Sequence, residues 1–558
     1  MCTDTGTAAN DWHGDRGAGL RRRGVLALTL MTVLAIAGPV DAQPKVTITG
    51  AVEHASSWSS NLSQSDLNFA RSGSDTEWYA RTRLRPDITA EVGTTKFVLT
   101  LEIDAVWGQT GATDVAAPRR FGASGSFDLN TDVSPLIEIK WAYTEFNLPI
   151  IPAATRVRLG AQPWTALYKG GILATGDFAG VHVTNQWTPR MKSHLTFVQI
   201  EEAATGPADG FIRGDDIGFV ASVEISPFKG LELRPLFSYV DIVGVTSAAT
   251  RQNRGGLASG ATVFPTCPGT TGPGTGGCLG GGIGSAVEDR FTVGADVRWR
   301  FGAFSLAPTV LYQFGRREQI SPTVSATSGP GIMPSLTRDA WYLDVRGGWQ
   351  AGPLLLEALA VYTTGNDADD RIDLNRSRLR YFEPISTDDT FLAGWTEMQT
   401  SGVDTGSRLR GNAGSLNSAV AMGYDKYGLM VAGLRASYAV TPAFTMRAMG
   451  NARWTAEEVD TASAVAAGTG LTPRCAAAAL DAGTCVDRGT ARYYGTEVNL
   501  GFEWKLAPNV ALDVMGSYFF AGPVLSSPAI TNTATGVVRS GRDPQDAQAI
   551  STRVRYSF

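Results

Sequence analysis

The stretch Trp78-Tyr-Ala-Arg-Thr-Arg-Leu-Arg-Pro-Asp-Ile-Thr-Ala-Glu91 alternates apolar residues with charged or polar ones. Successive side chains of an extended strand point to opposite faces, so Trp78, Leu84 and Ile88 share one face and three arginines share the other. A water-soluble sheet would turn the apolar face toward a core. A barrel in a membrane would turn it toward lipid and the arginines toward its interior.

The same alternation recurs along the chain. Apolar residues occupy every second position in segments 97–107, 291–301 and 496–504, and charged side chains fall between them. Trp and Tyr stand repeatedly at the ends of the apolar faces, as in the aromatic girdles of transmembrane barrels. After Gln43 no run reaches the ~18 apolar residues that a transmembrane helix needs.

The composition agrees with a sheet protein. Of 558 residues, 64 are Gly, which is about 11% against a usual ~7%, and glycine is unfavourable inside helices. With 43% hydrophobic and 18% charged residues, the composition excludes a disordered chain, a collagen-like repeat and a helical membrane protein. The net charge of -5 argues against nucleic acid as a partner.

The connections between these segments alternate along the chain between short and long. Short links are predicted at residues 92–95, 149–154, 188–190, 228–230, 302–303, 351–353, 441–443 and 507–509. This rhythm is typical of an antiparallel up-and-down barrel with short periplasmic turns and long extracellular loops. We therefore predict an all-β transmembrane barrel of about 18 strands. A secreted solenoid or propeller is the alternative, but it would need a fixed repeat period that the sequence lacks.

The N-terminal part of the chain predicts a leader. A basic stretch at 21–23 precedes the apolar run 25–37, which is too short to span a bilayer but suits the core of a signal peptide. Residues 40–42 supply small or modest side chains for cleavage. A short buried helix is the alternative. We expect residues 1–42 to be removed and residues 43–558 to form a single barrel domain.

Four cysteines of the expected mature chain form two local pairs, Cys267 with Cys278 and Cys475 with Cys485. Each pair closes a loop rich in Gly, Pro, Thr or Ala and falls in a long outer segment. We therefore predict two loop disulfides, formed in an oxidising compartment. A four-cysteine zinc site is the alternative, but the Cys-x2-Cys spacing of such sites is absent.

The last segment ends in Val554-Arg-Tyr-Ser-Phe558. With the leader and the alternating strands, this ending resembles Gram-negative outer-membrane porins. Segments 81–91 and 101–104 are similar to early strands of homotrimeric porins and of the alginate-export type barrel, which implies about 16 or 18 strands. The resemblance also implies an outer-membrane location and an assembly signal at Tyr556 and Phe558 that the barrel-assembly machinery reads. The oligomeric state that the resemblance suggests is a homotrimer.

Arginines dominate the face opposite the apolar one, with acids between them. Guanidinium groups stay charged at any accessible pH, so rows of them would make a positive strip that favours anions in a water-filled pore. In the alternative, each arginine pairs with an acid on a neighbouring strand and stabilises the wall. The predicted pore-lining residues are Arg81, Arg83, Arg85, Asp87, Glu102, Asp104, Arg156, Arg158, Arg290, Arg298, Arg300, Arg447, Arg453, Arg553 and Arg555.

The sequence carries no catalytic motif, and only three histidines follow the leader. We expect no enzyme activity, no cofactor and no metal. The predicted function is a passive channel for small hydrophilic, anion-favoured solutes, surrounded by outer-membrane lipid. One alternative is a substrate-specific or polysaccharide export channel that guides an alginate-like polyanion. Another is a plugged barrel that works as an enzyme or an adhesin.

Overall fold

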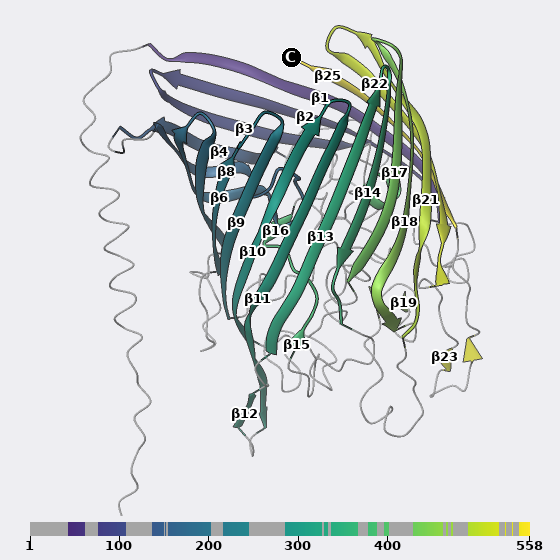
Figure 1. Ribbon diagram of the computed structural model, residues 1–558. Helices are drawn as coiled ribbons and strands as arrows, with labels where there is room; N and C mark the ends of the chain where they lie inside the picture. Colours follow the sequence, from purple (N-terminus) through teal and green to yellow (C-terminus); the bar gives the residue numbers. More distant parts are fainter. Residues whose placement is uncertain are drawn as a thin grey trace, which may run out of the picture.

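The computed structural model describes residues 43–61, 76–107, 137–149, 151, 154–201, 216–244, 285–325, 329–332, 336–366, 378–387, 395–400, 428–460, 465–466, 470–471, 489–523, 530–531, 538–539 and 546–558. Eighteen long strands form the wall of one closed antiparallel barrel, within a sheet of 21 strands (Figure 1). The wall strands are β1 (Lys45–Ser60), β2 (Glu77–Val92), β3 (Thr95–Val106), β4 (Ile137–Asn147), β5 (Ala154–Thr165), β6 (Ala174–Thr188), β7 (Met191–Glu201), β8 (Asp216–Ile225), β9 (Leu231–Gly244), β10 (Ser285–Phe301), β11 (Phe304–Ser325), β13 (Leu336–Ala351), β14 (Leu354–Thr363), β17 (Leu429–Thr441), β18 (Phe444–Asp460), β21 (Gly489–Ala507), β22 (Val510–Ala521) and β25 (Ala547–Ser557).

The wall closes on itself. Each wall strand pairs antiparallel with the wall strands next to it in the chain, and β1 pairs with both β2 and β25. The seam extends to the last residue: the Gly50 N–H donates to the Phe558 carbonyl at 2.9 Å, and the Phe558 N–H donates back to Gly50 at 3.0 Å. A closed sheet leaves no strand edge unpaired in hydrocarbon. The predicted all-β up-and-down barrel of about 18 strands is confirmed.

The short links gather at one end of the barrel, the upper end in Figure 1, where the C-terminus also lies. Each predicted short link joins two neighbouring wall strands, from the β2–β3 turn to the β21–β22 turn. Gly93 and Gly302 have φ of 59° and 60°, a region that glycine enters without steric cost, so these chains reverse within two residues. The connections at the other end are much longer, as between Gly244 and Ser285.

Apolar side chains cover the outside of the wall. Ile139, Leu434 and Leu500 are 67%, 68% and 64% exposed, whereas the inward carboxylates Asp296 and Asp344 are buried. The two faces of each strand are thus divided as the period-two pattern predicts. A closed sheet with an apolar outer surface is the form in which β-proteins span the outer membrane of Gram-negative bacteria, which agrees with the predicted location.

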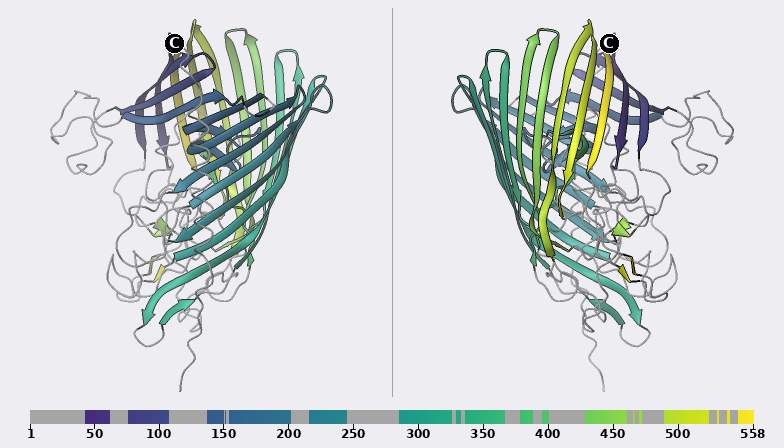
Figure 2. Two further views of the ribbon diagram at one scale, coloured as in Figure 1. Left: turned by 90° about the vertical axis from the view of Figure 1, so that its left-hand side faces the viewer. Right: turned by 90° about the vertical axis from the view of Figure 1, so that its right-hand side faces the viewer.

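Several short elements belong to the connections. They are β12 (Gly329–Ile332), β15 (Arg378–Leu379), β16 (Ser386–Thr387), α2 (Glu397–Thr400), β19 (Val465–Ala466), β20 (Gly470–Leu471), β23 (Ile530–Thr531) and β24 (Val538–Arg539). Figure 2 shows β12 alongside the far end of β11, beyond the rest of the wall. No helix in the described ranges is long and apolar enough to cross a membrane.

Two connections fold into the barrel and position the candidate site. We name residues 166–173, between β5 and β6, the inner loop. We name residues 378–387 and 395–400, both from the connection between β14 and β17, the strap. The leader and the four cysteines, Cys267, Cys278, Cys475 and Cys485, lie outside the described residues, so cleavage and the two disulfides stay predictions.

Candidate functional site in the barrel interior

The inner faces of β8 to β17 carry an apolar patch, although a barrel interior of this size would otherwise meet water. Leu311 and Tyr342 of this patch form one buried cluster with Leu173 of the inner loop and with Phe382 and Ile385 of the strap. Full burial of one such side chain contributes about 1.5–3 kcal/mol. The apolar patch therefore holds the inner loop and the strap against the wall.

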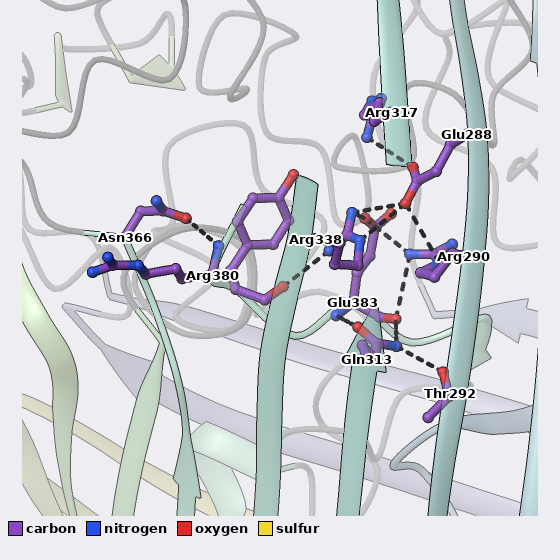
Figure 3. A network of polar contacts seen from close by, with 10 residues as sticks. Glu288, Arg290, Thr292, Gln313, Arg317, Arg338, Asn366, Arg380 and Glu383 are labelled. Carbon is purple, nitrogen blue, oxygen red and sulfur yellow. Dashed lines mark hydrogen bonds and ion pairs between the residues drawn. The ribbon is translucent and has the colours of Figure 1, made fainter. Parts of the chain in front are cut away.

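A buried charge network ties the strap to three wall strands (Figure 3). One carboxylate oxygen of Glu383, Oε2, lies 2.9 Å from Arg290 Nη1 and 2.9 Å from Arg338 Nη2. The backbone of Glu383 is also held, because its N–H donates to Gln313 Oε1 at 2.9 Å and its carbonyl accepts from Gln313 Nε2 at 2.7 Å. Glu383 is therefore fixed at both its side chain and its main chain.

Glu288 of β10 completes the buried network. It lies 2.9 Å from Arg338 Nη2 and 3.1 Å from Arg317 Nη1, so two carboxylates bind three guanidinium groups. All five side chains are at most 4% exposed. Ions buried to this extent are tolerated only when they are paired, and removing one partner of such a group costs about 3–5 kcal/mol. We call Glu288, Arg290, Arg317, Arg338 and Glu383 the buried network.

Tyr381 of the strap adds a further contact to the buried network. Arg338 lies over its ring at 5.0 Å from the centroid, and Arg338 Nη1 donates to the Tyr381 carbonyl at 2.9 Å. Burial raises the pKa of the Tyr381 hydroxyl to about 12, and the positive charge of Arg338 opposes that rise only in part. The hydroxyl is therefore neutral at physiological pH.

The strap is anchored at two further places. Its β16 pairs in parallel with β6, and the Ile385 N–H donates to the Leu173 carbonyl of the inner loop at 2.7 Å. At α2 the Met398 N–H donates to Glu497 Oε1 of β21 at 2.8 Å, and the Glu397 N–H donates to Asn499 Oδ1 at 3.3 Å.

The anchors lie on separate parts of the wall. The first is β13, with which β15 pairs, the second is β6 and the third is β21. No two of these strands are neighbours in the barrel. The strap therefore crosses the interior from one part of the wall to another rather than following one strand.

The inner loop is held by its own ion pairs. Lys169 Nζ lies 3.2 Å from Asp296 Oδ1 and 3.8 Å from Asp344 Oδ1, and it donates to the Ala307 carbonyl at 2.5 Å. Burial lowers the pKa of the Lys169 amine, although the two carboxylates oppose this shift. These contacts join the inner loop to β10, β11 and β13.

Other parts of the inner wall carry charged side chains that reach water. On β2 and β3, Arg83 bonds to both oxygens of Asp104 at 2.6 Å, and Arg85 Nε donates to Glu102 Oε2 at 2.7 Å. Lys140 of β4 joins Glu102 at 3.3 Å. The Arg85 side chain is 36% exposed, so this cluster is paired and hydrated at once.

Two further clusters have the same character. On β3 to β5, Glu145 binds Lys96, Arg156 and Arg158. On β18 to β25, Arg447 contacts Glu503 and Asp513, and Asp513 also lies 3.0 Å from Arg553. Water-facing ion pairs of this kind contribute little to stability, but together they set the electric field of the interior.

The structure places the predicted pore-lining residues on the inward face, in three different surroundings. Arg81, Arg290 and Arg453 are buried. A second group is paired or hydrogen-bonded beside water, namely Arg83, Arg85, Asp87, Glu102, Asp104, Arg156, Arg158, Arg447 and Arg553. The third group consists of Arg298, Arg300 and Arg555. Arg298 lies over the Tyr168 ring at 4.4 Å from the centroid. Arg300 is exposed and Arg555 is half-exposed. Most of these arginines thus follow the pairing alternative.

The sequence patterns missed the strap and the partners that hold it. The period-two pattern does not identify Arg317, Arg338 and Glu288, because it separates inward from outward residues but not buried residues from hydrated ones. One local signal was available. Tyr381-Phe-Glu-Pro-Ile385 is a mostly apolar run inside the longest polar connection, and apolar runs in loops usually pack against something.

In the described part of the chain, no group of three or more His, Cys, Asp or Glu residues is placed to hold a metal ion.

Comparison with known proteins finds no matching family model and no curated relative. Among solved structures, the chain is similar to Pseudomonas aeruginosa OccK11 (OpdR), with 8% identity, a TM-score of 0.41 and coverage of 92% of this chain and 96% of that one. It is also similar to Pseudomonas aeruginosa OpdO, with 10% identity, a TM-score of 0.43 and coverage of 92% and 97%. A BenF-like porin from Pseudomonas fluorescens Pf-5 has 10% identity, a TM-score of 0.42 and coverage of 93% and 98%.

Proposed function

We propose that the protein is a passive outer-membrane channel for small hydrophilic solutes, with a preference for anions. The observation that carries the proposal is the division of the interior. The inner loop and the strap cover the apolar patch of β8 to β17, whereas β2 to β5 and β18 to β25 present charged side chains that reach water. Charged walls of this kind keep a passage hydrated and bias the ions that cross it.

The mechanism is restricted diffusion, in which no bond is made or broken. Solutes pass beside the strap along the hydrated wall, where arginines keep their charge at every accessible pH. The preference for anions rests on the cluster of β3 to β5, where three cations share the single carboxylate of Glu145. The strap limits the width of the path because it crosses the interior between separate parts of the wall.

The test is the single-channel conductance of the refolded mature chain in a planar bilayer. We expect steady current with an anion-to-cation permeability ratio above one, obtained from reversal potentials in a salt gradient. A protein that inserts as a folded barrel and carries no current would contradict the channel. A ratio below one would contradict the anion preference while leaving the channel intact.

A second candidate is a dedicated channel for one solute class, including an alginate-like polyanion. The observation that favours it is the strap, because a crossed interior selects among solutes more strongly than an open one. A soluble polyuronate added to the bilayer distinguishes the two functions. Under the second candidate micromolar polymer reduces the ion current, whereas a general diffusion channel is unaffected by it.

We also propose that Tyr556 and Phe558 form the assembly signal read by the barrel-assembly machinery. The main chain of Phe558 closes the seam with Gly50, so the signal and the final strand pairing share this residue. A Phe558→Ala variant should insert more slowly in cells and still refold in detergent. The native size of the detergent-solubilised protein tests the homotrimer that the porin resemblance implies.

A further inference from the structure

Four charged side chains meet on the inward face at the end of the barrel that carries the short turns. They are Lys96 of β3, Glu145 of β4, and Arg156 and Arg158 of β5. Lys96 Nζ lies 3.1 Å and Arg156 Nε lies 3.2 Å from Glu145 Oε1, and Arg158 Nε donates to Glu145 Oε2. We call Lys96, Arg156 and Arg158 the cationic triad.

The charge of this cluster is unbalanced. Three cations share one carboxylate, and Glu145 is 1% exposed whereas the side chains of Lys96, Arg156 and Arg158 are 29%, 57% and 31% exposed. The negative charge is therefore covered by its partners, and the positive charges face the interior. A solute that reaches this cluster therefore meets ammonium and guanidinium groups, while the Glu145 carboxylate is covered.

The arginines of the triad also keep donors available. A guanidinium has five N–H groups in a planar fork that matches an oxyanion in two-point contact. Glu145 contacts Arg156 through Nε, one of these five donors, at 3.2 Å, and the Arg156 side chain is 57% exposed, so its outer N–H groups can reach a solute. Arg158 is held over the Tyr143 ring at 5.4 Å, so its fork is oriented before any solute arrives.

The neighbouring strands add one acid beside this cluster, which lowers its net charge from +2 to +1. Glu91 stands opposite Lys96 in the register of β2 with β3, while Thr184 and His182 stand opposite Arg156 and Arg158 in the register of β5 with β6. One acid therefore adjoins the triad on the Lys96 side. The arginine side is bordered by neutral or basic groups.

We propose that the cationic triad is an oxyanion-binding site that takes the carboxylate or phosphate group of a solute at the short-turn end of the passage. The inference rests on the proposed function in one respect, because solutes reach the site through the interior. It goes beyond a general preference for anions because it assigns a local, saturable site. Removal of the site should weaken oxyanion binding more than removal of equal charge elsewhere.

The experiment uses inorganic phosphate as the probe and the refolded mature chain as the protein. In bilayers, phosphate should reduce the chloride current of the native protein in a saturable way. The double variant Arg156→Gln with Arg158→Gln removes two unit charges about 6 Å from the ion, and we expect the half-inhibiting phosphate concentration to rise about tenfold or more. Arg156→Lys with Arg158→Lys keeps the charge and loses the fork, so we expect a smaller rise.

The matched control removes the same charge from another water-facing cluster. Arg447→Gln with Arg553→Gln also lowers the net charge by two, but these residues lie on β18 and β25 beside Glu503 and Asp513. We expect little change in phosphate inhibition for this pair. An equal rise in both double variants would overturn the local site, because only the total charge of the interior would then matter.

A second measurement separates this inference from the channel itself. Calorimetric titration of phosphate into the detergent-refolded barrel does not require ion conduction. Saturable binding to the native protein that is lost in Arg156→Gln with Arg158→Gln supports the site even if the bilayer carries no current. Absence of saturable binding to a folded native barrel overturns the site even if the channel conducts.

Discussion

The barrel interior has two sides that use the same side chains in opposite ways. On the covered side, Glu288 and Glu383 bind three arginines that no water reaches. On the open side, Glu102 and Glu145 also bind several cations, but the cations there are partly exposed. Arginine–carboxylate pairs therefore hold a segment in place where they are buried and shape the field of a passage where they are wet. The surroundings of a pair, rather than its chemistry, decide its role.

The largest expected effect is the loss of Glu383. Glu383→Gln leaves Arg290 and Arg338 buried without the strap carboxylate that pairs with both, and we expect the free energy of unfolding or of strap release to fall by about 3–5 kcal/mol. The strap should then leave the wall and the single-channel conductance should rise. Guanidinium unfolding and bilayer recordings measure the two consequences. Glu503→Gln, which breaks the partly exposed pair with Arg447, is the control and should change neither by a comparable amount.

If Glu383→Gln remains folded and its conductance equals that of the native protein, the claim that buried pairs hold the strap in place is wrong. This result would mean that the apolar patch alone holds the strap. In that case the buried network would be a consequence of docking and not its cause.

The second effect is a loss of strap attachment in alkali. The Tyr381 pKa is raised from 10 to about 12, so the hydroxyl ionises in the released strap at a lower pH than in the docked one. Its contribution is fully present below pH 10 and is lost as the pH rises toward 12, by at most about 3 kcal/mol. Conductance recorded between pH 9 and 12 should therefore rise. The variant Tyr381→Phe keeps every other titrating group of the native protein, so its conductance should rise less over the same pH range.

The wall could be derived from the sequence far more completely than the covered side of the interior. Inward and outward residues follow from the period-two pattern, and the pairing of Arg83 with Asp104 follows from the register of β2 with β3. The buried network does not, because Glu383 meets Arg290 and Arg338 across 93 and 45 residues of sequence. No local periodicity specifies which long connection folds inward. The one local signal for a docked segment in the longest polar connection is the apolar run at 381–385.

A smaller loss of stability should distinguish an apolar side chain buried in the strap from one on the outer face of the barrel. Ile385 of the strap is buried, so Ile385→Val should lower stability by about 0.5–1.5 kcal/mol through a lost methyl contact. Ile48 lies on the outer face of the barrel and is 60% exposed, so Ile48→Val is the matched control. We expect a shift in the guanidinium midpoint for the first variant and almost none for the second. Equal shifts would indicate that the strap is no better packed than the lipid-facing surface.

The smallest effect on stability is expected for an arginine of the open side. In Arg85→Gln, Glu102 keeps Arg83 at 2.9 Å and Lys140 at 3.3 Å, so no carboxylate is left unpaired. Because Arg85 is partly exposed, the free energy of unfolding should fall by only about 0–1 kcal/mol. The reversal potential should nevertheless move toward that of a cation-preferring channel, since one positive charge has left the wall. Arg338→Gln makes the same chemical change inside the buried network and should show the reverse: a large loss of stability, with any change in current following from release of the strap. If Arg85→Gln proved as destabilising as Arg338→Gln, the open side would not be hydrated, and its arginines would serve the wall rather than the passage.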